Sequence, residues 1–122
     1  MAAQTTIGLE KFVNEFELEN LTPNIPLEGK SLAQKFVNRP ALQLTGFFDH
    51  FDNTRIQIIG RIEHTYMRRQ TAEVRNQILD KLFSFHIPCI VFCKDLEPFP
   101  EIYELAEKYS VPVFRTSDLS LI

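Results

Sequence analysis

The residues best suited to chemistry follow apolar runs in the second half of the chain. Glu63 and His64 come shortly after the run at residues 55–59, and a carboxylate beside an imidazole can act as a general acid/base pair. The alternative is that both are surface groups opening the next helical segment. Arg115 and Thr116 follow the last apolar run, where a guanidinium and a hydroxyl could hold an anion. Thr116 could instead start a turn or a cap.

A second group of reactive side chains lies in residues 46–52. Asp49, His50 and Asp52 combine two carboxylates with an imidazole, a set found in metal and hydrolytic sites. Phenylalanines at positions 47, 48 and 51 interleave with them, and large aromatic side chains are usually buried. We therefore predict that this segment is a helix end packed on the core and that it holds no metal.

Motifs for nucleotide, zinc or nucleophilic chemistry are absent from the sequence. None of its four glycines is spaced as in a phosphate-binding loop. Cys89 and Cys93 lie in one predicted strand, about 13 Å apart, which is too far for a disulfide. Their C-x3-C spacing has no second ligand pair, so we expect reduced core thiols. No serine or cysteine has a base at a meaningful spacing. His86 is predicted to cap the preceding helix.

The elements that must position these groups alternate in the second half of the chain. Short apolar runs at residues 55–59, 89–92 and 112–114 read as strands, and residues 71–85 and 98–109 read as helices. The order βαβαβ requires parallel pairing and right-handed crossovers, with helices covering the sheet. We expect an α/β fold, a three-layer α/β/α sandwich with a mainly parallel sheet. The helix at residues 71–85 should face the sheet with one apolar stripe, formed by Val74, Ile78, Leu82 and Phe85.

The first half of the chain is predicted to hold shorter elements. A helix capped by Thr5 or Thr6 should run through Glu15, followed by a strand at residues 16–20. Residues 21–30 contain two prolines and a glycine and read as a loop, followed by a short extended piece near position 31. A short helix is expected at residues 40–46, with Pro40 in its first turn and residue 38 or 39 as its cap.

Composition limits the class of protein. A chain of 122 residues is long enough for one domain, so residues 1–122 are expected to form a single unit. The net charge of -3 argues against a nucleic-acid partner, because such affinity comes mainly from clustered Lys and Arg. No signal peptide and no run of about 20 apolar residues is present, so we expect no membrane partner and a cytoplasmic location.

Three ordered segments resemble the N-terminal domain of bacterial HPr kinase/phosphorylase. They are Asn-Arg-Pro-Ala-Leu-Gln-Leu-Thr-Gly-Phe-Phe-Asp-His-Phe at 38–51, the pair Arg-Ile-Gln-Ile-Ile-Gly and Glu-His-Thr-Tyr at 55–60 and 63–66, and a closing strand-helix-strand at 88–116. The resemblance covers residues 7–117. Two departures are Ala41, where a glycine is common in the family, and Lys94-Asp95, where an Arg-Gly pair is frequent.

The resemblance implies a fold similar to the N-terminal domains of that family and, at the level of fold alone, of Mur ligases. It implies a parent that phosphorylates a serine of HPr, a carrier of the sugar phosphotransferase system, with ATP or pyrophosphate, and that also removes the phosphate. The P-loop, catalytic Asp and magnesium site of the family belong to a C-terminal kinase domain, so ATP and Mg²⁺ are expected there and no cofactor here. The parent is expected to be a homohexamer that acts in carbon catabolite control.

The leading hypothesis is a non-catalytic accessory or regulatory domain whose partners are its own kinase domain and, through the parent, HPr. No catalytic residue is predicted in this chain. The alternative is a small-ligand sensor that binds a sugar phosphate or a nucleotide at the carboxyl ends of the strands. Its candidate contacts are Arg39, Gln43, His64, Arg115 and Thr116. A third hypothesis is acid/base chemistry by Glu63 with His64.

Overall fold

The computed structural model describes residues 6–33, 37–49 and 51–117, and its centre is a five-stranded sheet. The strands lie in the order β2 (Glu19–Asn20), β7 (Val113–Arg115), β6 (Ile90–Phe92), β5 (Ile56–Ile59) and β4 (Val37–Asn38). The four from β4 to β7 are parallel, and β2 pairs antiparallel with β7 at one edge. The predicted mainly parallel βαβαβ sheet is confirmed.

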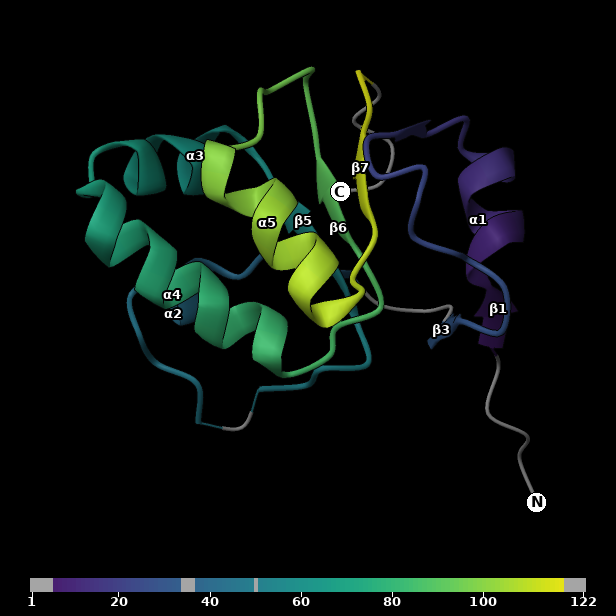
Figure 1. The fold of residues 1–122 in the computed structure, drawn as a ribbon, viewed down its shortest axis with the longest axis horizontal. Helices are drawn as coiled ribbons and strands as arrows, with labels where there is room; N and C mark the ends of the chain where they lie inside the picture. Colours follow the sequence, from purple (N-terminus) through teal and green to yellow (C-terminus); the bar gives the residue numbers. More distant parts are fainter. Residues whose placement is uncertain (1–5, 34–36, 50, 118–122) are drawn as a thin grey trace.

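Helices cover both faces of this sheet (Figure 1). One face carries α2 (Ala41–Leu44), α3 (Arg61–Arg68), α4 (Ala72–Ser84) and α5 (Pro100–Tyr109). The other side carries α1 (Leu9–Glu15), beside a two-stranded antiparallel sheet of β1 (Thr6–Gly8) and β3 (Ser31–Ala33). The fold is therefore the expected three-layer α/β/α sandwich.

Alternate residues of the central strands supply two separate hydrophobic cores. Ile58 and Val91 point toward α1, whereas Ile59 and Phe92 point toward α4 and α5. Because both faces are covered, consecutive strand positions are apolar, which is why these strands show no hydrophobic alternation. Within the described residues, no helix has the length and hydropathy needed to cross a membrane.

Helix α4 faces the core with a stripe that differs from the predicted one. Its buried residues are Leu79, Leu82 and Phe83, while Val74 is 38% exposed. The prediction was wrong for Val74 because two stripes, offset by one position, both fit a 3.6-residue period here. His86 ends the helix as predicted: its backbone is left-handed, and its N–H donates to the Phe83 carbonyl at 2.9 Å.

The start of the chain differs from the predicted helix. The helix begins at Leu9 with Gly8 as its cap, and Thr6 belongs to β1, while Thr5 lies outside the described residues. Pairing of β1 with β3 gives the backbone of residues 6–8 the hydrogen-bond partners that it would otherwise have in a longer helix. The tertiary pairing therefore overrides the threonine cap signal. The predicted strand at 16–20 is shortened to Glu19–Asn20 because Phe16 still closes the helix.

The segment before α2 is a strand and not a helix cap, which corrects the predicted role of residues 38 and 39. Pro40 is the N-cap of α2, and no side chain caps the helix. Asn38 instead forms β4, which pairs with β5. The helix ends at Leu44, shortly before Gly46, whose φ of 98° is the left-handed conformation that glycine adopts at little cost.

Candidate functional site

The carboxyl ends of β5, β6 and β7 are held together by backbone hydrogen bonds. The N–H of Cys93 donates to the Ile59 carbonyl at 3.0 Å, and the N–H of Thr116 donates to Phe92 at 2.9 Å. Asp95 closes the turn after β6 by donating to the Thr116 carbonyl at 3.1 Å. These hydrogen bonds join the three strand ends at the edge of the sheet where parallel α/β domains bind ligands.

Two consecutive residues after β6 have left-handed backbones, Lys94 with φ 56° and Asp95 with φ 55°. This conformation is unfavourable for side-chain-bearing residues, although Asp tolerates it better than most. At position 95, where the family frequently has glycine, this chain thus places a residue that tolerates the left-handed conformation.

Arg115 lies at this edge between two carboxylates. Its Nε and Nη2 donate to Glu19 at 3.1 and 3.2 Å, and its Nη1 donates to Glu97 at 2.6 Å. The hydrogen bonds that Arg115 donates to Glu19, and then to Glu97, raise the pKa of Arg115 above its ordinary value. The neighbouring Thr116 is buried. The guanidinium that could have held an anion is already occupied by two side-chain anions.

Arg39 is engaged in the same way at the end of β5. Its Nη2 donates to Oε1 of Glu63 at 3.1 Å, and the same oxygen accepts the N–H of Gly60 at 2.7 Å. Glu63 is only 4% exposed. A Cβ on Gly60 would come within 2.7 Å of Arg39 Nη2, so the absence of a side chain at residue 60 allows the close approach of the guanidinium.

Gln43 belongs to a buried amide cluster that joins β4, β5 and α2. Nδ2 of Asn38 donates to Gln57 at 2.7 Å and to Gln43 at 3.3 Å. Gln57, which is fully buried, donates onward to the Arg55 carbonyl at 2.9 Å. Buried amides need partners, and here they satisfy one another, so this cluster fixes β4 against the sheet.

Glu63 and His64 do not form a pair. Glu63 turns inward to Gly60 and Arg39, whereas Nε2 of His64 donates to the Glu97 carbonyl at 2.7 Å. The His64 ring stacks on Phe99 with centroids 4.7 Å apart. The prediction that both are surface groups is wrong for Glu63, because it caps the first turn of α3 and binds a guanidinium from another element.

The aromatic segment before β5 packs on the core at two of the three predicted positions, and the prediction was wrong for Phe47, which is 48% exposed. Phe48 and Phe51 contact Phe85 at centroid distances of 5.2 and 5.1 Å, and both pack against the core beneath α4. Asp52 accepts the N–H and the hydroxyl of Thr54, as in an Asx turn. His50 lies outside the described residues, among which no group of three potential metal ligands is found.

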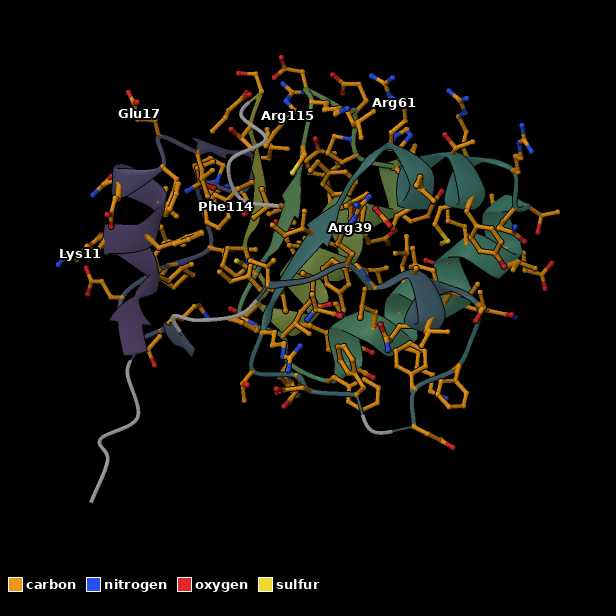
Figure 2. All side chains as sticks on the ribbon, turned by 180° about the vertical axis from the view of Figure 1, so that it is seen from behind. Lys11, Glu17, Arg39, Arg61, Phe114 and Arg115 are labelled. Carbon is orange, nitrogen blue, oxygen red and sulfur yellow. The ribbon has the colours of Figure 1, made fainter. Side chains whose placement is uncertain are left out.

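The five predicted contact residues therefore fall into separate groups, and Figure 2 shows Arg39 apart from Arg115. His64 and Arg115 meet at Glu97, with Thr116 beside them in the chain. Arg39 and Gln43 have other partners, Glu63 and Asn38. Among the described residues, the printed hydrogen bonds do not join the five into one cluster. A hollow of about 410 Å³ lies elsewhere, between residues 21–25 and α5, where Glu104 and Glu107 line it.

Both predicted core cysteines, Cys89 and Cys93, are buried thiols. Burial raises the pKa of the Cys89 thiol well above its ordinary value, so it stays protonated and unreactive.

Comparison with known proteins decides the family. The model described as "HPr Serine kinase N terminus" matches residues 7–121. The chain belongs to this family. An HPr kinase/phosphorylase of Lachnoclostridium phytofermentans is 49% identical over 111 residues, which cover 91% of this chain and 36% of that protein. One of Caldicellulosiruptor bescii is 40% identical over 116 residues, 95% of this chain and 37% of that protein.

The HPr serine kinase N-terminal family thus accounts for almost the whole chain. A more distant HPr kinase/phosphorylase, of Leptospira biflexa, is 37% identical over 103 residues, which cover 84% of this chain and 32% of that protein. The chain spans about a third of the length of these relatives. The resemblance of the three segments at 38–51, 55–66 and 88–116 is confirmed.

Proposed function

We propose that this chain is a non-catalytic accessory domain of an HPr kinase/phosphorylase. The observation that carries the proposal is that the polar side chains at the carboxyl edge of the sheet bind one another. Arg39 binds Glu63, and Arg115 binds Glu19 and Glu97. A catalytic or phosphate-binding site at this edge would need such groups to face a ligand.

In this proposal, the part of the parent that has no counterpart here carries the chemistry. HPr, ATP or pyrophosphate, and Mg²⁺ bind there, and the parent assembles as a homohexamer. The relatives are named HPr kinase/phosphorylase and are almost three times as long as the matched region, which supports the assignment. The accessory domain then acts on the kinase through contact or by recruiting partners.

A kinase assay on the purified 122-residue chain tests the proposal. The chain is incubated with HPr, Mg²⁺ and radiolabelled ATP, and the full-length Lachnoclostridium phytofermentans relative serves as the positive control. We expect labelled HPr only with the full-length protein. Stoichiometric labelling of HPr by the chain alone would overturn the proposal.

The accessory role has its own test in the same relative. Deletion of the segment that matches this chain is expected to leave HPr phosphorylation in place, with the assembly state checked by sedimentation velocity. Complete loss of phosphorylation in a deletion protein of unchanged assembly would show that this domain supplies part of the catalytic site.

A further inference from the structure

The seven arginines of the chain divide into two sets. Four of them hold carboxylates: Arg39 with Glu63, Arg55 with Asp52, Arg75 with Glu101, and Arg115 with Glu19 and Glu97. The other three, at positions 61, 68 and 69, lie on α3 and at its end, and none forms an ion pair within the part of the chain that the structure describes. All three are exposed.

The outer face of α3 also carries exposed apolar side chains. Ile62 is 71% exposed and Tyr66 is 40% exposed. Together with Arg61, Thr65 and Arg69 they line a shallow hollow of about 350 Å³. The inner face holds the buried Glu63 and Met67 instead. Figure 2 shows Arg61 directed away from the body of the molecule.

This combination suits a partner protein better than solvent. Burial of an exposed isoleucine side chain is stabilising. The chain as a whole has a net charge of -3, so three arginines that hold no carboxylate among the described residues are a local excess of the opposite sign. A partner with carboxylates and an apolar side chain would match both features.

We propose that the outer face of α3, formed by Arg61, Ile62, Thr65, Tyr66 and Arg69, is a docking surface for an acidic, extended segment of a partner protein. Arg61 and Arg69 are eight residues apart, which is about 12 Å along the helix axis. In an extended segment, side chains at alternate positions share one face, and four residues span about 13 Å. A segment Asp-x-Leu-x-Glu therefore places one carboxylate at each arginine and the leucine over Ile62 and Tyr66.

Other partners fit this face less well. Nucleic-acid affinity grows with the number of phosphates neutralised, and three arginines beside two apolar side chains offer few such contacts. An anionic membrane would bind a helix with a wider apolar face, since binding scales with the buried apolar area. The inference goes beyond the proposed function and does not depend on it.

The test is a titration of the ¹⁵N-labelled 122-residue chain with the peptide Gly-Asp-Ser-Leu-Ser-Glu-Gly, followed by amide chemical shifts. We expect saturable shifts at residues 61–69. Two matched peptides serve as controls: one has lysines in place of the acids, and one has serine in place of the leucine. The first should cause no shifts, and the second should bind at least fivefold more weakly.

Variants locate the surface. Arg61→Glu and Arg69→Glu should each weaken binding at least fivefold, and Ile62→Ser should weaken it about as much as loss of the leucine. Lys11→Glu is the matched charge reversal, since Lys11 is exposed on α1 at the opposite side of the sheet (Figure 2), and it should leave binding unchanged.

Four results would overturn the proposal. The first is the absence of shifts at residues 61–69 at millimolar acidic peptide, and the second is equal binding of the lysine peptide. The third is stronger perturbation of α3 by single-stranded DNA or by phosphatidylserine vesicles than by the acidic peptide. The fourth is self-association in sedimentation velocity that Arg61→Glu abolishes, because a second copy would then be the occupant of the α3 face.

Discussion

Helix α3 has two faces that use charged residues in opposite ways. On the inner face, Glu63 accepts the guanidinium of Arg39 and the N–H of Gly60. On the outer face, two positions away, Arg61 extends from the surface beside the exposed Ile62. The inner charges fix the helix to the sheet, whereas the outer charges hold no carboxylate in the described part of the chain.

The contrast teaches that an arginine near a sheet's carboxyl edge is informative only once its partners are known. Arg39 and Arg115 have the position expected of ligand contacts, yet both bind acidic side chains of the domain itself. The arginines of α3 have no such partner among the described residues. The paired set should therefore affect stability, and the unpaired set should affect binding.

Glu63→Ala should cause the largest loss of stability. The change leaves the Gly60 N–H and a partly buried guanidinium without their acceptor, which costs about 3 kcal/mol. Urea unfolding followed by circular dichroism measures the loss, with Glu63→Gln as the control that keeps one acceptor oxygen. A loss below about 1 kcal/mol for Glu63→Ala would show that the inner face does not depend on this carboxylate.

Arg75→Ala should have an intermediate effect. Arg75 holds both oxygens of Glu101, at 2.6 and 3.2 Å, and the two side chains are 13% and 17% exposed. Partial burial and two hydrogen bonds favour a loss of about 1.5 kcal/mol, measured by urea unfolding at pH 7. Arg75→Lys, which keeps the charge but not the fork, should fall between the wild type and Arg75→Ala.

The same pair makes the stability depend on acid. The hydrogen bond from Arg75 lowers the pKa of Glu101 below its ordinary value of 4.5. Its contribution is therefore complete above that value and is lost as the pH falls through the lower pKa of the folded protein, because the unfolded chain binds the proton first. Arg75→Ala should lose less free energy of unfolding than the wild type between pH 5 and about pH 3. Parallel acid profiles would contradict this origin.

The smallest effect on stability is expected from Arg61→Ala and Arg69→Ala. Exposed side chains without partners usually contribute less than about 0.5 kcal/mol, so urea midpoints should stay close to the wild-type value. A loss of more than about 1 kcal/mol from either substitution would place these arginines with the paired set and would remove the contrast between the faces.

Much of the fold could be predicted from the sequence because the signals are local. The apolar runs at 55–59, 89–92 and 112–114, separated by helical patterns, are sufficient for a parallel sheet with covered faces. The shorter elements could be predicted only in part: α2 and β2 lie within the predicted ranges 40–46 and 16–20, and β3 begins at the predicted extended piece near position 31. β4 is only Val37–Asn38 and depends on pairing with β5, and the start of α1 depends on β1 pairing with β3.

The site was less predictable because its partners are distant in the chain. Arg39 and Glu63 are 24 residues apart, and Arg115 and Glu19 are 96 apart, so no spacing rule connects them. One local signal was available: Glu63 lies three residues after Gly60, the spacing at which a carboxylate caps the N-terminus of a helix. The exposed outer face of α3 could not be predicted from hydrophobic periodicity alone. It depends on which residues of the helix the core covers.

We propose that the arginines at the carboxyl edge serve the fold and not a ligand. Isothermal titration calorimetry tests this directly, with fructose 1,6-bisphosphate, ATP, UDP and inorganic phosphate added to the chain at millimolar concentration. We expect no heat beyond dilution for any of the four. Saturable heat with one of them, abolished by Arg39→Ala or Arg115→Ala, would show that these arginines bind a ligand and would identify the domain as a small-ligand sensor.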